Sequence, residues 1–135
     1  MINARLLSKN SIETGDAGLI AAWKSDPSAT IWLDVEHELT PEVSALLEGL
    51  GCEEVSLRTV VRDRHPPKVE DFGASTFLLI RGIAELDDSL ELKPQQISMF
   101  VNERLLVTVH RGHSVSTSYY WEQTQTQPEL LADPA

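Results

Sequence analysis

The 135-residue chain contains a single cysteine, Cys52, and this scarcity excludes two classes of small protein. One thiol cannot form an internal disulfide framework, and it cannot supply a thiolate zinc cluster. The sequence therefore gives no sign of an oxidising compartment, and a reducing cytoplasm is the default expectation.

Long apolar runs are also missing. The run FLLI at 77–80 stops at Arg81, whereas a membrane-spanning helix needs about 20 apolar residues. At the N-terminus, Lys9, Asn10 and Ser11 interrupt the chain before the apolar core of a signal peptide can develop. We expect these first residues to belong to the mature protein and the chain to be soluble.

Basic residues are few, because 11 Lys and Arg stand against 21 Asp and Glu, for a formal net charge of −10. Such a surface repels nucleic acid and anionic lipid, so divalent cations and basic proteins are better candidate partners. An apolar content of 41% is typical of a folded protein, and the length predicts one domain.

Helix signals concentrate in the first half of the chain. Thr40, Pro41 and Glu42 combine a capping hydroxyl, a proline at the first helical position and an acid in the first turn, so a helix is expected from there to about residue 50. Asp16 is expected to cap a short helix with three apolar side chains on one side, Leu19, Ile20 and Trp23. A further helix over about 53–61 is expected to bury four side chains, Val55, Leu57, Val60 and Val61.

Strand signals are spread along the whole chain. β-branched and aromatic runs predict strands over 2–7, 30–35, 68–72, 75–84, 95–101 and 105–109. The double proline at 66–67 makes the third of these an edge strand, and Gly73 permits a tight turn after it. The spacing around Asn102 and Glu103 is that of a two-residue hairpin. From Ser114 the chain is polar, and a peripheral helix carrying Tyr119, Tyr120 and Trp121 is expected.

Two groups of side chains are candidate metal ligands. If the strand over 30–35 continued, its acids would share one face, although a solvated turn is the favoured interpretation; these acids are Asp34, Glu36 and Glu38. His110 and His113 offer two imidazoles, but the intervening Arg111 would repel a bound cation, so exposed strand-end residues are favoured over zinc ligands. Cys52 with His110 is the only nucleophile and base pairing to consider, and a buried inert thiol is the favoured interpretation.

The connection between the strands over 75–84 and 95–101 is rich in acids: Glu85, Asp87, Asp88 and Glu91. Magnesium prefers carboxylates and keeps several waters, so one or two of these acids facing acids of a neighbouring subunit could bind it. A solubilising loop is the alternative interpretation.

A small basic run precedes and opens the strand over 68–72. It consists of Arg62, Arg64 and Lys68. These residues are expected to form ion pairs with Glu70 and Asp71 rather than an anion site.

Six segments in one order carry a family resemblance: WLDVE at 32–36, TPE at 40–42, RHPPKVEDF at 64–72, FLLIR at 77–81, QQISMFV at 95–101 and LVTVH at 106–110. Together they resemble the amino-terminal cytoplasmic domain of the CorA-type divalent-cation transporters, which include magnesium transporters and related zinc transporters. The resemblance covers about residues 31–111. The chain departs from the family at 57–60, where relatives commonly carry a Glu-Asp pair.

The resemblance implies a three-layer α/β/α sandwich around a mixed, largely antiparallel central sheet. Residues 1–127 would be this domain, and 128–135 would begin the connection to a stalk helix that is absent from the chain. It also implies a non-enzymatic part of a homopentameric transporter of magnesium, cobalt or zinc, at the cytoplasmic face of the cell membrane. The pore helices and their Gly-Met-Asn signature are absent from these residues, so we expect the chain alone not to conduct ions.

The family's regulatory cation sites lie between subunits, and by position the resemblance implies Asp87 or Asp88 as the metal ligand, with Mg²⁺ as a regulatory ion. The runner-up function is a stand-alone acidic module that recruits a basic partner. A hydrolase using Cys52 and His110 is the third hypothesis.

Overall fold

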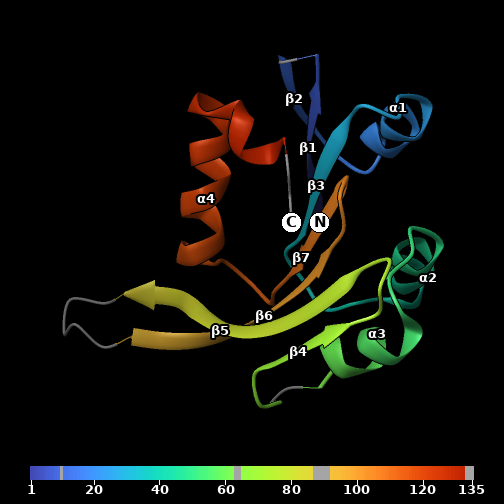
Figure 1. The fold of residues 1–135 in the computed structure, drawn as a ribbon. Coiled ribbons are helices and arrows are strands. Elements are labelled where there is room, and N and C mark those ends of the chain that lie inside the picture. Colours follow the sequence, from blue (N-terminus) through green and yellow to red (C-terminus); the bar gives the residue numbers. More distant parts are fainter. Residues whose placement is uncertain (10, 63–64, 87–91, 133–135) are drawn as a thin grey trace.

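The computed structural model describes residues 1–9, 11–62, 65–86 and 92–132, and these form a seven-stranded sheet with the order β2-β1-β3-β7-β6-β5-β4 (Figure 1). The strands are β1 (Ile2–Ser8), β2 (Ser11–Gly15), β3 (Thr30–Val35), β4 (Lys68–Asp71), β5 (Thr76–Leu86), β6 (Leu92–Val101) and β7 (Leu105–Val109). The helices are α1 (Leu19–Ser25), α2 (Pro41–Gly49), α3 (Glu54–Val60), α4 (Val115–Thr126) and the short 3₁₀ helix η1 (Pro128–Leu131).

The sheet is mixed and largely antiparallel, which confirms the predicted fold class. β3 pairs parallel with β7, with Val35 opposite Val109, and the other pairings between the described strands are antiparallel. This parallel pair joins the first three strands to the last four. It also brings the carboxyl ends of β3 and β7 to the same edge.

Helices cover both faces of the sheet: α1, α2 and α3 on one, α4 and η1 on the other (Figure 1). Alternate residues of β3 serve the two faces, because Ile31, Leu33 and Val35 belong to the main core while Trp32 packs with Leu131 of η1. The main core also takes buried side chains from α1, α2, α3, β5 and β7, among them Trp23, Leu47, Leu57, Phe77 and Val107. The sandwich expected from the sequence is therefore the observed architecture.

The helix starts follow local capping chemistry. Thr40 caps α2, since its hydroxyl accepts a hydrogen bond from the Val43 amide at 3.2 Å, as predicted. Asp16 was expected to cap the first helix, and this expectation is wrong. The N-cap of α1 is Gly18, and the Asp16 carboxylate accepts from the Gly18 amide at 2.8 Å in the turn before the helix.

The expected burial of α3 is also wrong in part. Leu57 and Val60 are buried, but Val55 and Val61 are 52% and 51% exposed. The buried positions instead include the small polar residues Ser56 and Thr59. A helix of seven residues can turn only one face to the core, and here that face includes hydroxyls where the apolar pattern favoured valine.

The turns around the strands differ from the sequence expectation at one place. β5 and β6 form the predicted hairpin, and β4 is the predicted edge strand, followed by Gly73 at φ 82°. The β6–β7 turn lies one residue later than predicted, because Val101 pairs with Leu106 and the Asn102 amide donates to the Leu105 carbonyl at 2.9 Å, which leaves 103–104 at the tip. The Asn102 side chain supports this turn by accepting from the amides of residues 104 and 105 at 2.9 and 2.8 Å, so no glycine is needed.

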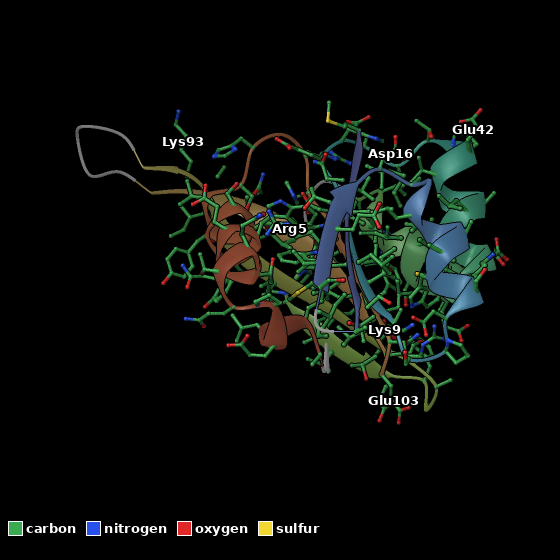
Figure 2. All side chains as sticks on the ribbon, turned by 90° about the horizontal axis from the view of Figure 1, so that it is seen from above. Arg5, Lys9, Asp16, Glu42, Lys93 and Glu103 are labelled. Carbon is green, nitrogen blue, oxygen red and sulfur yellow. The ribbon has the colours of Figure 1, made fainter. Side chains whose placement is uncertain are left out.

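The second face is held to the sheet by Arg5 of β1, which Figure 2 places on the side facing α4. Its buried guanidinium lies 4.6 Å from the Trp121 ring centre, donates to Thr124 Oγ1 at 2.7 Å and also donates to the Trp121 carbonyl. Thr30 Oγ1 donates to the carbonyl of Leu131 at 2.6 Å and so fixes η1.

The domain boundary expected at residue 127 stays a prediction.

Arg104, just before β7, ties that strand to the end of α1. Its guanidinium donates to the carbonyls of Trp23, Asp26 and Ala29 at 2.8, 2.7 and 3.1 Å, and it lies 4.9 Å from the Trp23 ring centre. These carbonyls lie at and just beyond the last turn of α1, where backbone acceptors need a partner from outside the helix.

We expect Arg104→Ala to lower the free energy of unfolding by about 2 kcal/mol, because it removes a charged donor from three carbonyls. Arg81→Ala is the matched control, since Arg81 is an exposed arginine and its replacement should change stability by less than about 0.5 kcal/mol. Urea denaturation of both variants measures this, and equal stability of the two would contradict the role given to Arg104.

Candidate functional site

The carboxyl ends of β3 and β7 form the candidate site. These strands are parallel neighbours, so the residues at and beyond their ends lie together: Asp34 and Glu36 from one, His110 and Arg111 from the other. In open sheets with parallel strands, ligands bind beyond the carboxyl ends of the strands.

A buried hydrogen-bond network occupies this edge. Asp34 Oδ1 accepts from Thr108 Oγ1 at 2.5 Å and lies 2.8 Å from His110 Nε2. Trp32 Nε1 donates to Thr108 Oγ1 at 2.9 Å. The exposed fractions of His110 and Asp34 are only 3% and 6%, so this ion pair is screened little by solvent.

His110 is placed to carry a positive charge. Its Nε2 faces the Asp34 carboxylate and its Nδ1 lies 2.7 Å from the Gly112 carbonyl oxygen, and only an imidazolium can donate to both. Burial lowers the pKa of His110. The opposite effect comes from the hydrogen bond and charge of Asp34, the hydrogen bond with the Gly112 carbonyl and the charge of Glu36, which together outweigh burial. The pKa of His110 therefore lies above its ordinary value of 6.5.

Two small cavities flank the network, and His110 lines both. The acidic cavity, bounded by α4, has a volume of about 140 Å³ and is lined by Asn3, Asp34, Glu36, Ser118 and Glu122 among others. The arginine cavity, bounded by the end of α3, has a volume of about 110 Å³ and is lined by Glu38, Arg62, Gln95, Ser98 and Arg111 among others. The site thus has a carboxylate side and a guanidinium side.

The acids predicted to share a face are divided by the structure. β3 ends at Val35, so the extended strand required for a common face does not form. Asp34 and Glu36 nevertheless line the acidic cavity together, whereas the exposed Glu38 lines the arginine cavity.

The two histidines do not come together as a metal site. Both nitrogens of His110 are occupied, and His113 is exposed. Within the described residues, no group of three or more His, Cys, Asp or Glu side chains is arranged to hold a metal ion. Asp87 and Asp88, the predicted metal ligands, lie outside the described residues, as does Glu91.

Cys52 lies in the main core and lines none of these cavities. Burial raises the pKa of its thiol to about 12, so it is uncharged at neutral pH. His110 directs its two nitrogens to other partners. The structure therefore does not bring the proposed nucleophile and base into a hydrogen-bonded pair.

The basic run behaves partly as expected. Lys68 pairs with Glu70 at 2.5 Å, in agreement with the predicted ion pairing. Arg62 instead lines the arginine cavity, and Arg64 lies outside the described residues.

Trp32 and Thr108, the two residues that complete the network, were not predicted as site residues from the sequence. A signal for them was available in the strand period. Trp32 and Asp34 alternate with apolar residues in one strand, and Thr108 and His110 do so in another, so each pair shares a face. What the period could not give is the parallel pairing that sets the two faces side by side.

We expect the stability that His110 contributes to depend on pH. Because its folded pKa is raised, the contribution is fully present below the unfolded pKa of about 6.5 and is lost as the pH rises through the folded pKa. His110→Gln should therefore be less stable than wild type by about 3 kcal/mol near pH 6, with the difference shrinking towards pH 9.

Urea denaturation across this pH range measures the difference. His113→Gln, which replaces an exposed histidine of the same loop, is the control and should leave the pH profile unchanged. A stability difference between wild type and His110→Gln that stays constant or grows with pH would contradict the buried ion pair.

Comparison with solved structures finds the same fold in other proteins. The chain superposes on full-length CmaX with a TM-score of 0.71 and 19% identity, over 89% of this chain and 37% of that one. It superposes on the CorA magnesium transporter of Methanocaldococcus jannaschii with a TM-score of 0.66 and 14% identity, over 96% of this chain and 38% of that one. For the ZntB cytoplasmic domain of Vibrio parahaemolyticus the TM-score is 0.56 at 17% identity, over 76% of this chain and 47% of that one.

At these identities the structures establish a common fold, and the chain spans less than half the length of each. The comparison with curated proteins gives no match. None of the helices in the described part of the chain has the length and apolar character needed to cross a bilayer. The family model for the CorA-like Mg²⁺ transporter protein matches residues 27–133. By this match over most of its length, the chain belongs to the CorA-like Mg²⁺ transporter family.

Proposed function

We propose that this chain is the cytoplasmic regulatory domain of a CorA-like transporter of divalent metal cations, and that the pore lies outside these 135 residues. One observation carries the proposal: 96% of the chain aligns with only 38% of a complete CorA magnesium transporter, within a sequence match to the same family. Most of that transporter has no counterpart here. The proposal places the domain at the cytoplasmic face of the cell membrane, in a homopentamer.

The charge of the chain supplies a physical route to regulation. Subunits with a net charge of −10 repel one another around a common axis, and divalent cations bound between them offset this repulsion. When the cytosolic cation is scarce, these sites empty and the subunits move apart. The cation must bind the closed arrangement more tightly than the open one, because equal affinity would shift no population.

We propose Asp87 and Asp88 as the acids that contribute to this intersubunit site, with Mg²⁺ as the regulatory ion. They belong to the connection over 85–91, which contains carboxylates and no basic residue. Carboxylates facing each other across subunits can hold Mg²⁺ through its retained waters.

In the complete transporter, replacing both acids (Asp87→Ala with Asp88→Ala) should weaken closure by Mg²⁺. We expect the Mg²⁺ concentration for half-maximal inhibition of flux to rise about tenfold, as for a coupling energy of about 1.4 kcal/mol. Flux into proteoliposomes at a series of internal Mg²⁺ concentrations measures this.

The matched control replaces another adjacent acid pair, Glu53→Ala with Glu54→Ala, which are both exposed at the start of α3. The control should keep the wild-type inhibition curve. An unchanged curve for the Asp87 and Asp88 variant would reject these residues, and absence of any divalent-cation flux in the complete protein would reject the transporter assignment. Parallel arms with Co²⁺ and Zn²⁺ identify the transported ion.

We also propose that the domain is not an enzyme. The hydrolase alternative needs a reactive thiolate, and burial raises the pKa of Cys52 to about 12. In the folded protein near pH 7.5, a maleimide should therefore label Cys52 at least about a hundredfold more slowly than in urea. Mass spectrometry follows the labelling. Similar rates in both conditions would support the hydrolase alternative.

A further inference from the structure

The connection between β7 and α4 is held to the sheet through its carbonyl groups. Gln95 Nε2 of β6 donates to the carbonyls of Arg111 and His113 at 2.8 and 3.0 Å. The carbonyl between them belongs to Gly112, and its oxygen lies 2.7 Å from His110 Nδ1 but 3.5 Å from Gln95 Nε2. The middle of the connection therefore depends on His110 for its short hydrogen bond.

That hydrogen bond requires a protonated ring. On the other side of the imidazole, Nε2 lies 2.8 Å from the Asp34 carboxylate, and both nitrogens of His110 thus face acceptors. A neutral imidazole carries one N–H, so it can donate to only one of the two. The carboxylate is the stronger acceptor, because hydrogen bonds to ionised groups are about twice as strong as neutral ones. After loss of one proton, the ring therefore donates to Asp34, and the Nδ1 lone pair faces the Gly112 carbonyl oxygen.

Gly112 has room to turn its carbonyl away from the ring. Its φ is 73°, and among the described residues no heavy atom except those of its chain neighbours lies within 4 Å of the position that a Cβ would take. Glycine adopts positive and negative φ about equally readily, so the peptide group after Gly112 can rotate at little steric cost. Two acceptor atoms held 2.7 Å apart repel each other, so loss of the proton from His110 Nδ1 favours this rotation.

The start of α4 lies directly beyond Gly112. Ser114, which is 1% exposed, is the N-cap of this helix, and its hydroxyl accepts from the Thr117 amide at 3.1 Å. In the first turn, Ser116 Oγ accepts from the Ile83 amide of β5 at 3.0 Å. A rotation at Gly112, two residues before the cap, therefore acts on the capping hydrogen bond and on the contact between α4 and β5.

Titratable and charged groups surround His110 from every neighbouring segment. They are Asp34 of β3, Glu36, His37 and Glu38 after it, Arg62 after α3, Arg111 of the connection itself and Glu122 of α4. Glu38 lies 3.7 Å from Arg111, and these two charges offset each other. Burial lowers the pKa of His110, but the hydrogen bonds of Asp34 and Gly112 and the charges of Asp34 and Glu36 outweigh it. The proton is therefore lost above pH 6.5, on the alkaline side of the ordinary histidine range.

We propose that His110 and Gly112 form a proton-controlled latch on the start of α4: the protonated ring holds the Gly112 carbonyl, and loss of the Nδ1 proton to solvent releases it and loosens the first turn of the helix. The latch differs from a general loss of stability, because it opens one connection while the sheet stays folded. It does not depend on the transporter function.

Carbon-detected NMR of the intact chain between pH 6 and pH 9 tests the latch, since this readout needs no amide proton. We expect the Gly112 carbonyl carbon and the Cα shifts of the first turn of α4 to change with the same midpoint as the His110 ring carbons. The Cα shifts should move towards random-coil values. The open fraction should rise about tenfold, as for the loss of one hydrogen bond to a charged group. The Cα shifts of α2, on the other face of the sheet, should stay constant.

Two variants sharpen the test. His113→Gln replaces the exposed histidine of the same connection and should keep the transition, whereas Asp34→Asn removes the facing charge and should move the midpoint to lower pH. The wild-type titration decides the question even if Asp34→Asn does not fold. A His110 ring that titrates while the Gly112 carbonyl and the first turn of α4 stay unchanged would overturn the latch. A transition that disappears in His113→Gln would overturn it as well.

Discussion

The parallel pairing of β3 with β7 is the constraint on which the rest of this structure depends. In the strand order, this pair is the junction between β2-β1-β3 and β7-β6-β5-β4. The neighbouring pairs on either side of it are antiparallel. Because parallel strands end at the same edge, it also places Asp34 next to His110, which are 76 positions apart in the chain. Neither half of the sheet contains the site by itself.

The buried network at this edge pairs a carboxylate with an imidazolium. A carboxylate and an imidazolium are costly to bury separately, and here each meets the other together with neutral donors and acceptors. The paired His110 then stands between a cavity lined by acids and a cavity lined by arginines. Any change in its charge therefore reaches both cavities, and this is the physical link between pH and stability.

The family assignment gives these features a setting. The regulation by electrostatic repulsion that we propose needs a strongly acidic surface on a stable fold. The chain supplies both, through its net charge of −10 and through a sheet covered on both faces by helices. Arg5 and Arg104 each use a guanidinium to hold a helix against the sheet.

Local chemistry determined a good part of this protein from sequence alone: the β3 strand, the start of α2 at Thr40 and the edge position of β4. These depend on nearest neighbours in the chain, such as a capping hydroxyl before proline or prolines before a short strand. The mixed fold class came from the family resemblance. The capping of α1 and the exposure of Val55 and Val61 were missed because the start of a short helix, and the face that it turns to the core, depend on its packing against the sheet. Only the tertiary structure decided that Asp34, Thr108 and His110 meet, since strand pairing across the sheet depends on long-range packing that no local pattern encodes.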